Sequence, residues 1–405
     1  MTDIPYSLSR ISSGLKRSVM RDLLKFAVSP DIISFAGGLP ANECMPLEEF
    51  RECVDAVLSR DGARVLQYSP PFDPLREWIA ATMRSRGVEC TAENVFITNG
   101  CQQGLTIMAR LLLDPGDAAV VEEITFTGVR QVIDGQGGRM LTVSTDLETG
   151  VDVDALEALL SSPLARKPRA AILITDFHNP LGVSISVEKR ERIAELAAMH
   201  RVPVIEDDPY SALRYSGEAI PPIKAFDSAG AVIYVGSFSK MLAPAARLGW
   251  IVAPAALIPR ITVVRESIDL ESSGLMQRAV FEFLSRGHLE PHLARLNAVN
   301  RERQAAMLDA LERRFGGIAR WSVPQGGLFV WVTLPEGVDT GTMFEAAIAR
   351  RVAYIPGAAF AVNGGHTNTM RLNYSSAAPG AIGEGIERLA ALVRQRLAEP
   401  VISEQ

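Results

Sequence analysis

Six short apolar segments, separated by longer polar and amphipathic ones, run from about residue 94 to residue 255. They are rich in Val and Ile, and their charged residues stand only at the segment ends. A strand that is apolar along its whole length is buried on both faces, which is typical of a mainly parallel sheet with helices on each side. The expected strands are 94–98, 118–123, 169–175, 202–206, 231–237 and 248–253.

The segments between these strands have helical spacing. In residues 186–200, Ile193, Leu196 and Ala197 recur on one face, and Ser186 stands where it would cap the helix N-terminus. Alternating strands and helices of this kind predict an α/β fold, and the ligand crevice of such a fold lies outside the carboxyl ends of its strands.

Residues 290–405 have a different pattern, which predicts a smaller α+β domain completed by the N-terminal arm. Its expected elements are a long charged helix over 293–315, a strand over 326–334, a helix around 341–351, a strand over 369–375 and a last helix from Pro379. The sequence thus predicts an N-terminal arm over 1–45, a large domain over 46–285 and a small C-terminal domain over 286–405.

Charge and composition exclude several classes of protein. The chain has 405 residues, and its 41 basic and 47 acidic residues are mixed along it to give a net charge of -6. Without a basic stripe, nucleic acid is not expected as a partner. No apolar run approaches the roughly 18 residues that span a bilayer, so no membrane is expected either. The first ten residues lack the basic start and apolar stretch of a secretory signal.

The cysteines point to a reducing compartment. None of the four forms a C-x-x-C pair, and no histidines cluster near them. A disulfide scaffold and a metal site are therefore not expected, and a cytoplasmic location fits better.

Polar motifs follow four of the expected strands. "NGCQQG" follows "VFIT", "DFHNPLG" follows "AAILIT", "EDDPY" follows "VPVIE", and "GSFSK" follows "AVIYV". Because the ends of parallel strands meet at one edge of a sheet, these four motifs are expected to converge on one site.

Together with "SFAGGLP", "GGLFVW" and "MRLNYS", these motifs resemble the fold-type I pyridoxal-phosphate (PLP) enzymes, specifically the class I/II aminotransferases and their 2-aminoadipate aminotransferase branch. The resemblance covers nearly the whole chain. It implies a three-layer PLP-transferase-like large domain with a mainly parallel sheet. It also implies transfer of an amino group from an L-amino acid to a 2-oxo acid by a ping-pong mechanism, and a homodimer with shared active sites.

Lys240 stands among Ser, Met, Leu, Ala and Pro, with no acidic partner in "GSFSKMLAP". An apolar setting favours the neutral, nucleophilic amine. The resemblance makes Lys240 the internal aldimine lysine. It makes Asp207 the carboxylate beside the pyridine nitrogen and Tyr210 a donor to the ring oxygen. Alone, the lysine reads equally well as a surface residue, and "EDDPY" as an acidic turn.

The resemblance also assigns the remaining cofactor contacts. Phosphate would lie at a helix N-terminus, which suits an anion, and an aromatic ring would stack on the cofactor. Asn179 would bond the ring oxygen and also meet the substrate. The expected phosphate and ring contacts are Gly100, Cys101, Gln102, Ser237, Ser239, Arg247 and Phe126. Phe126 reads equally well as a core residue, and Asn179 as part of an Asn-Pro turn.

For the substrate, the resemblance implies that Arg371 clamps the α-carboxylate, a task that suits a planar guanidinium. Arg371 reads alternatively as part of a structural salt bridge. Gly38 would let the backbone approach the substrate. Tyr68 would reach the phosphate of the neighbouring subunit, and Arg21 would meet the substrate side chain, although "RDLLK" is also typical of a charged helix face.

Three departures from the family pattern stand out. The stretch "SPPFDPLR" after Tyr68 lacks a glycine and looks about two residues short, which puts the reach of Tyr68 in doubt. "HNPLG" has Leu181 where threonine is usual and His178 before the asparagine, and either could change the substrate accepted. Cys101 replaces a small residue or serine, which should matter little because the backbone does most of the binding there.

Two other functions stay open. The same site could serve a PLP-dependent lyase, decarboxylase or racemase, although Arg371 favours keeping the carboxylate. A non-catalytic effector domain of a transcription regulator is less expected, because only about forty residues precede "FAGGLP", too few for a helix-turn-helix domain.

Overall fold

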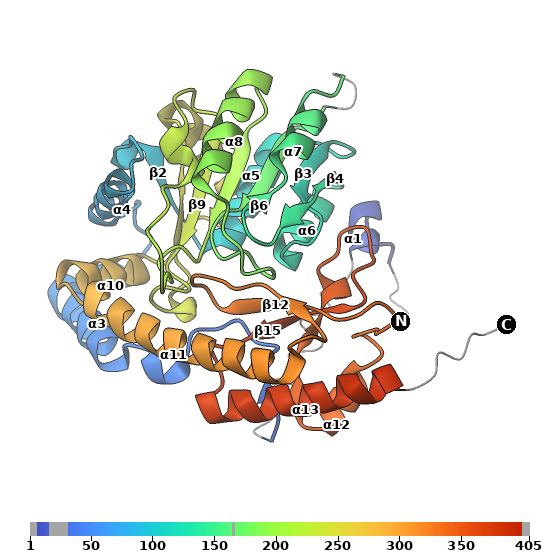
Figure 1. The fold of residues 1–405 in the computed structure, drawn as a ribbon. Coiled ribbons are helices and arrows are strands. Elements are labelled where there is room, and N and C mark those ends of the chain that lie inside the picture. Colours follow the sequence, from blue (N-terminus) through green and yellow to red (C-terminus); the bar gives the residue numbers. More distant parts are fainter. Residues whose placement is uncertain (1–5, 16–30, 164–166, 399–405) are drawn as a thin grey trace.

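The computed structural model describes residues 6–15, 31–163 and 167–398. Its centre is a seven-stranded sheet of order β2-β10-β9-β8-β7-β3-β4 (Figure 1). β10 is antiparallel to both of its neighbours, and the other pairings are parallel. The strands are β2 (Val95–Thr98), β3 (Ala118–Glu122), β4 (Arg139–Val143), β7 (Ala170–Ile174), β8 (Val204–Asp208), β9 (Val232–Ser237) and β10 (Gly249–Val252).

Helices cover both faces of this sheet. On one face, a core that includes Leu105, Val129 and Ile261 packs α5 (Cys101–Leu112), α6 (Thr127–Asp134) and α9 (Ile258–Glu266) against the strands. On the other face, a core that includes Leu156 and Ile193 packs α7 (Val153–Leu160) and α8 (Val187–His200). The three-layer α/β fold expected from the apolar strands is confirmed.

A second, smaller region lies below the large sheet in Figure 1. Its antiparallel sheet has the order β11-β12-β15-β14, and a core with Leu311, Val330, Leu372 and Leu389 joins it to the long helices α11 and α13. The elements are α11 (Leu289–Phe315), β11 (Arg320–Trp321), β12 (Phe329–Thr333), α12 (Phe344–Ala349), β14 (Ile355–Pro356), β15 (Thr369–Asn373) and α13 (Pro379–Ala398).

The N-terminal segment belongs structurally to this small region. β1 (Ile33–Ser34) pairs in parallel with β13 (Val352–Ala353), more than 300 residues away in sequence. Next in the chain, α3 (Leu47–Asp61) packs against α10 (Gly274–Ser285), beside α4 (Asp73–Ser85). A short helix, α1 (Arg10–Gly14), and the hairpin of β5 (Thr145–Asp146) and β6 (Gly150–Val151) complete the described elements. The domain boundaries at 45 and 285 stay a prediction.

Local sequence signals set the element ends. Ser186 Oγ accepts a hydrogen bond from the backbone N–H of Lys189, so the predicted cap of α8 is present. α11 begins at Leu289, four residues before the predicted start at residue 293. None of the helices in the described part of the chain is long and apolar enough to cross a membrane.

Candidate active site

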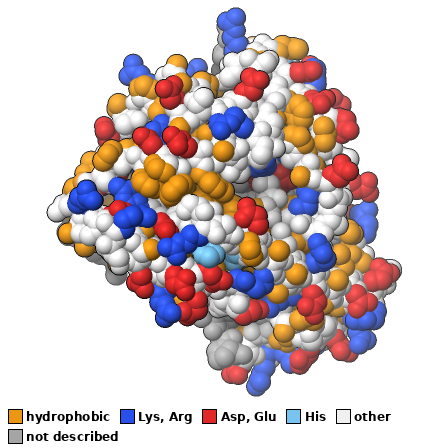
Figure 2. Space-filling view, turned by 90° about the vertical axis from the view of Figure 1, so that its left-hand side faces the viewer, with side chains coloured by type: hydrophobic (Ala, Val, Ile, Leu, Met, Phe, Trp, Pro, Cys, Tyr) orange, Lys and Arg blue, Asp and Glu red, His pale blue; other side chains and the backbone are white. Residues whose placement is uncertain are grey.

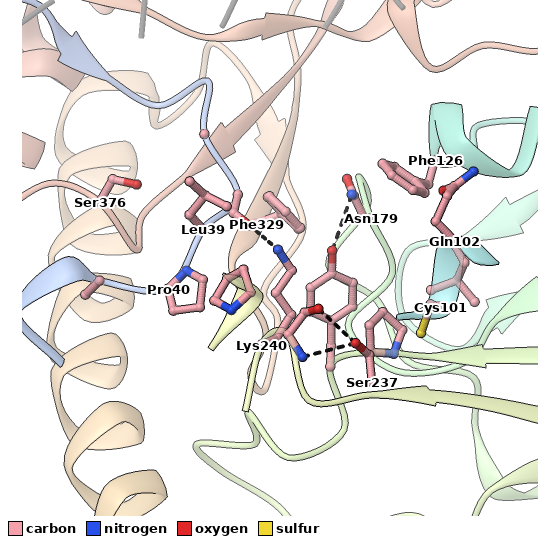
Figure 3. Close-up of a pocket in the computed structure, with 18 of the residues that line it drawn as sticks. Leu39, Pro40, Cys101, Gln102, Phe126, Asn179, Ser237, Lys240, Phe329 and Ser376 are labelled. Carbon is pink, nitrogen blue, oxygen red and sulfur yellow. Dashed lines mark hydrogen bonds between the residues drawn. The ribbon is translucent and has the colours of Figure 1, made fainter. Parts of the chain in front are cut away.

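A cavity of about 870 Å³ lies where the carboxyl ends of β7, β8 and β9 face the segment 34–43 and the small sheet. It brings together residues from distant parts of the chain (Figure 3). Twelve of the sequence-predicted site residues line it: Gly38, Cys101, Gln102, Phe126, Asn179, Asp207, Tyr210, Ser237, Ser239, Lys240, Arg247 and Arg371.

Lys240 follows β9, and its side chain crosses the cavity toward the N-terminal segment. Its Nζ donates a hydrogen bond to the backbone oxygen of Gly38 at 2.7 Å (Figure 3). Burial lowers the pKa of Lys240 to about 8, and the positive charges of Arg371 and Arg247 act in the same direction. Since a neutral amine is the nucleophilic form, a substantial fraction of this lysine is reactive near neutral pH.

Asp207 is the buried carboxylate at the end of β8. Its Oδ1 has no hydrogen-bond partner among the described residues, and burial raises the pKa of Asp207 to about 7. A buried polar atom without a partner is costly, so its presence at a cavity points to a missing donor. A protonated ring nitrogen is such a donor.

The next residue, Asp208, has partners for both oxygens. Its Oδ2 accepts from Tyr234 at 2.8 Å and from Arg86 at 2.9 Å, and its Oδ1 accepts from the N–H of Ser211 at 2.9 Å. The positive charge of Arg86 holds the pKa of Asp208 below its ordinary value, against the effect of burial. Asp207 and Asp208 are therefore neighbours in sequence but different in chemistry, one open to a ligand and the other a structural anchor.

Asn179 connects Tyr210 to Arg371. Its Nδ2 donates to the hydroxyl of Tyr210 at 3.4 Å, and its Oδ1 accepts from Arg371 Nη1 at 2.9 Å. The Arg371 guanidinium lies 4.4 Å from the ring centre of Phe329 and also donates to the carbonyl groups of Ala36 and Gly37. Burial raises the pKa of Tyr210, so its phenol stays protonated, and lowers that of Arg371 to about 10, which leaves the guanidinium charged at neutral pH.

Arg371 has no acidic partner among these contacts, and its Nε has no hydrogen-bond partner in the described residues. A buried cation held by neutral oxygens retains an uncompensated charge, so it suits an incoming carboxylate. The alternative of a structural salt bridge is not what the described residues form.

An anion cradle lies at the N-terminus of α5. Gly100 caps this twelve-residue helix without a capping side chain and has φ +87°, a conformation that favours glycine. A Cβ atom at Gly100 would lie 3.1 Å from Arg247 Nη2. Nearby, the hydroxyls of Ser237 and Ser239 are 2.9 Å apart. Free helix N–H groups, two hydroxyls and a guanidinium together suit a phosphate.

Phe126 and Gln102 lie on the side of the cavity away from Leu39 and Pro40 (Figure 3). The close approach of the Phe126 ring depends on Gly128, where a Cβ atom would lie 2.3 Å from Phe126 Cε1. Gln102 Nε2 donates to the carbonyl group of Gly128 at 3.1 Å and fixes the same turn. Phe126 is thus both packed against the core and available to the cavity, so its two interpretations do not exclude each other.

The structure does not bring two of the predicted residues to the cavity. Tyr68 is 79% exposed and does not line the cavity of its own chain. Arg21 lies outside the described residues. The shortened loop after Tyr68 is fastened by side chains of the segment around α10: the N–H of Ser69 donates to Glu271 and that of Phe72 to Gln277.

Leu181 corrects an expectation. It is buried in a core cluster with Trp331 and Phe360 and does not line the cavity, so direct contact with a substrate there has no support. Conversely, Leu39, Glu43, Phe329 and Ser376 line the cavity although the sequence did not single them out. Leu39 and Phe329 stand inside the recognised motifs "FAGGLP" and "GGLFVW", which was the available signal.

Among the described residues, no group of three or more His, Cys, Asp or Glu side chains could hold a metal ion. The residues present do fit PLP: Asp207 faces the position of a ring nitrogen, the α5 N-terminus offers a phosphate cradle, and Lys240 offers a reactive amine.

Comparison with known proteins agrees with this geometry. The family model "Aminotransferase class I and II" matches residues 33–389. An aromatic-amino-acid aminotransferase from Thermococcus litoralis is 39% identical, over 95% of this chain and 93% of the relative. A kynurenine aminotransferase from Pyrococcus horikoshii, solved with PMP, superposes with a TM-score of 0.91 at 36% identity and covers 97% of this chain and 98% of its own.

A third relative bears on the cofactor. The α-aminoadipate aminotransferase of Thermus thermophilus, solved with N-(5'-phosphopyridoxyl)-L-leucine, has a TM-score of 0.88 at 36% identity and covers 96% of this chain and 98% of its own. The cofactor of the present chain is pyridoxal 5'-phosphate. With the matched family model and relatives of this identity along nearly its whole length, the chain belongs to the class I and II aminotransferases, PLP-dependent enzymes that transfer amino groups.

Proposed function

We propose that this enzyme moves the amino group of an L-amino acid to a 2-oxo acid by a ping-pong mechanism. One observation carries the proposal. A lysine of lowered pKa, a buried carboxylate without a partner and an arginine without an acidic partner all face one cavity. A fold alone would not favour transamination, but these three groups supply a base, a partner for the cofactor ring and a carboxylate clamp.

When bound, PLP supplies an electron sink for the negative charge that develops at the substrate Cα. Lys240 is the covalent anchor of the cofactor. After release, its amine removes the proton from Cα and returns it elsewhere as a general acid. Asp207 keeps a proton on the ring nitrogen, which maintains the electron demand of the ring. Tyr210 and Asn179 donate to the ring oxygen, and Phe126 packs on the ring face.

The phosphate group is held by the α5 N-terminus, with Gly100, Cys101 and Gln102, and by Ser237, Ser239 and Arg247. These groups are supplied by α5, the end of β9 and the loop before β10, so a phosphate held by all of them fixes the position of the cofactor ring. Because the backbone of α5 and the arginine carry the main electrostatic attraction, the side chain of Cys101 contributes little.

Arg371 binds the α-carboxylate of the substrate, while Asn179 orients the guanidinium and Gly38 gives the backbone room to approach. Retention of the carboxylate favours transamination over decarboxylation. The named relatives act on aromatic amino acids, kynurenine or aminoadipate. Each is an amino acid, and the partner substrate that closes the cycle is a 2-oxo acid.

We also propose a homodimer in which Tyr68 reaches the phosphate of the neighbouring subunit. Apolar side chains are exposed on the side of the molecule that carries α3 and α10 (Figure 2). Leu47, Leu58, Leu66 and Tyr68 are exposed in and directly after α3. A tyrosine that is exposed in its own chain and sits beside exposed leucines is what an interface between two copies would cover.

All four cysteines are free thiols, and three of them are buried. We propose a cytoplasmic location, since thiols persist in a reducing compartment.

Steady-state kinetics test the function. With an amino acid and a 2-oxo acid as varied substrates, we expect parallel double-reciprocal lines and one 2-oxo acid formed for each amino group transferred. Intersecting lines with release of ammonia or CO₂ would instead assign the enzyme to the lyases or decarboxylases. Lys240→Ala, which removes the anchoring amine, is the matched inactive control.

A further inference from the structure

The segment Ala36–Leu39 is tied to the cavity wall through each of its carbonyl groups. Those of Ala36 and Gly37 accept from Arg371 Nη2, that of Gly38 accepts from Lys240 Nζ, and that of Leu39 accepts from Ser375 Oγ, each at 2.7 Å. Four consecutive anchors leave this backbone little freedom. The direction of the Leu39 side chain is therefore set by the fold.

That side chain lies at the cavity in an unusual state for a leucine. Leu39 lines the cavity and is 58% exposed, and Pro40 and Phe329 line the same side (Figure 3). Apolar surface that a rigid backbone holds in water gains free energy when an apolar partner covers it. At a substrate cavity, the group available to cover it is the side chain of the substrate.

The charges near Leu39 point to the same class of substrate. Among the described residues that line the cavity, the cations are Lys240, Arg247 and Arg371, and the proposed function uses all three. The nearest charged neighbour in the segment, Glu43, is an anion, and it is already paired with Arg303. A second carboxylate on the substrate would meet an anion and apolar surface here, without a free cation to receive it.

We infer that the preferred amino donor has an uncharged apolar side chain, of the leucine, methionine or phenylalanine type, and that Leu39 forms the wall that this side chain contacts. This inference rests on the proposed transamination. It assigns to Leu39 a specificity-determining contact with the donor, and it places the discrimination in the side chain of the donor and not in its α-carboxylate, which Arg371 binds in every donor.

The test is the single-turnover reaction of the PLP-loaded enzyme with L-phenylalanine, L-leucine, L-alanine, L-glutamate and L-2-aminoadipate, followed by the change in cofactor absorbance. We expect the two apolar donors to have the highest ratio of rate to dissociation constant. Leu39→Ala should lower that ratio by about tenfold for leucine and phenylalanine, the effect of removing methylene contacts. The ratio for alanine should stay unchanged, because its methyl group is too short to reach position 39.

Leu39→Lys supplies the missing cation and should raise the ratio for glutamate and aminoadipate relative to leucine. Leu47→Lys is the matched control, because Leu47 is 72% exposed and does not line the cavity. Faster reaction of the wild-type enzyme with glutamate or aminoadipate than with leucine and phenylalanine overturns the inference, as does an equal loss for alanine in Leu39→Ala. Failure of all five donors would instead overturn the proposed transamination.

Discussion

Lys240 and Arg371 hold adjacent carbonyl groups of one segment. Lys240 Nζ donates to Gly38 and Arg371 Nη2 donates to Gly37, both at 2.7 Å. Two cations therefore meet at neighbouring peptide groups inside a buried site. Because the lysine is the weaker base, it is the group that loses its proton there, and the guanidinium stays charged.

The rate at which the apoprotein captures PLP should therefore depend on pH. Burial and the charge of Arg371 lower the pKa of Lys240 to about 8. Only the unprotonated amine reacts, so we expect the capture rate, measured by the growth of cofactor absorbance, to rise through pH 8 and then level off. Arg371→Met should move the midpoint to higher pH. Arg247→Met, which removes a smaller contribution, should move it less, and an unmoved midpoint in Arg371→Met would contradict the proposed coupling.

Asp207 and Asp208 should separate activity from stability. Asp207→Asn removes the anion beside the ring nitrogen, and we expect turnover to fall by about a hundredfold or more, with little loss of stability because Oδ1 has no partner to lose. Asp208→Asn breaks the contacts with Arg86 and Tyr234, which should cost about 3 kcal/mol of the free energy of unfolding. Turnover and urea unfolding of both variants decide. The opposite pattern would exchange the two assignments.

The stability of the apoprotein should carry a signature of Asp207. Burial raises its pKa from 3.8 to about 7, so the folded state binds a proton that the unfolded state releases. The stabilisation is fully present below pH 3.8 and is lost as the pH rises through 7. We expect the free energy of unfolding of the wild type, relative to Asp207→Asn, to be higher at pH 5 than at pH 8. Glu206 titrates in both proteins, so the difference isolates Asp207.

Much of the fold could be predicted because burial leaves a direct trace in sequence. β7 and β8 are buried along their whole length, and apolar runs mark them. The direction of β10 left no such trace, because an apolar strand has the same composition whether it runs parallel or antiparallel. The separate behaviour of Asp207 and Asp208 depended on the family motif, since the partners of Asp208 come from Arg86 and Tyr234, far away in sequence.

The cavity wall could not be predicted from local patterns. Arg371 binds a carbonyl group 335 residues away, and the carbonyl group that Lys240 binds is 202 residues away. Such contacts depend on how the small sheet meets the large one. Leu39 became a candidate only when its backbone anchors and exposed side chain were seen together.

Gly100 offers a test of the phosphate cradle with a close control. Gly100→Ala should weaken PLP binding, because its Cβ would lie 3.1 Å from Arg247 Nη2 and displace that guanidinium. Gly116 also has a positive φ, +93°, but a Cβ there would have nothing within 4 Å. Both substitutions strain the backbone by about 1 kcal/mol or more. Only Gly100→Ala should reduce PLP affinity, measured by equilibrium titration of the apoprotein. Equal PLP affinity in the two variants would count against the cradle.

The shared site makes a prediction about mixtures of inactive subunits. Tyr68 is exposed in its own chain, whereas Lys240 is buried in the cavity. If Tyr68 completes the site of the other subunit, Tyr68→Ala and Lys240→Ala damage different sites of a mixed dimer. One site then carries both defects and the other carries none. Random pairing makes half of the dimers mixed, so unfolding and refolding an equal mixture should restore about a quarter of wild-type turnover.

Each variant refolded alone is the control and should stay at its own low activity. Lys240→Ala refolded with Asp207→Asn is the matched negative control, because both changes fall in the site of the same chain and their mixed dimer contains no intact site. Recovery in the Tyr68 mixture but not in the Asp207 mixture would place Tyr68 in the neighbouring active site. Equal recovery in both, or none in either, would confine Tyr68 to the surface of its own subunit.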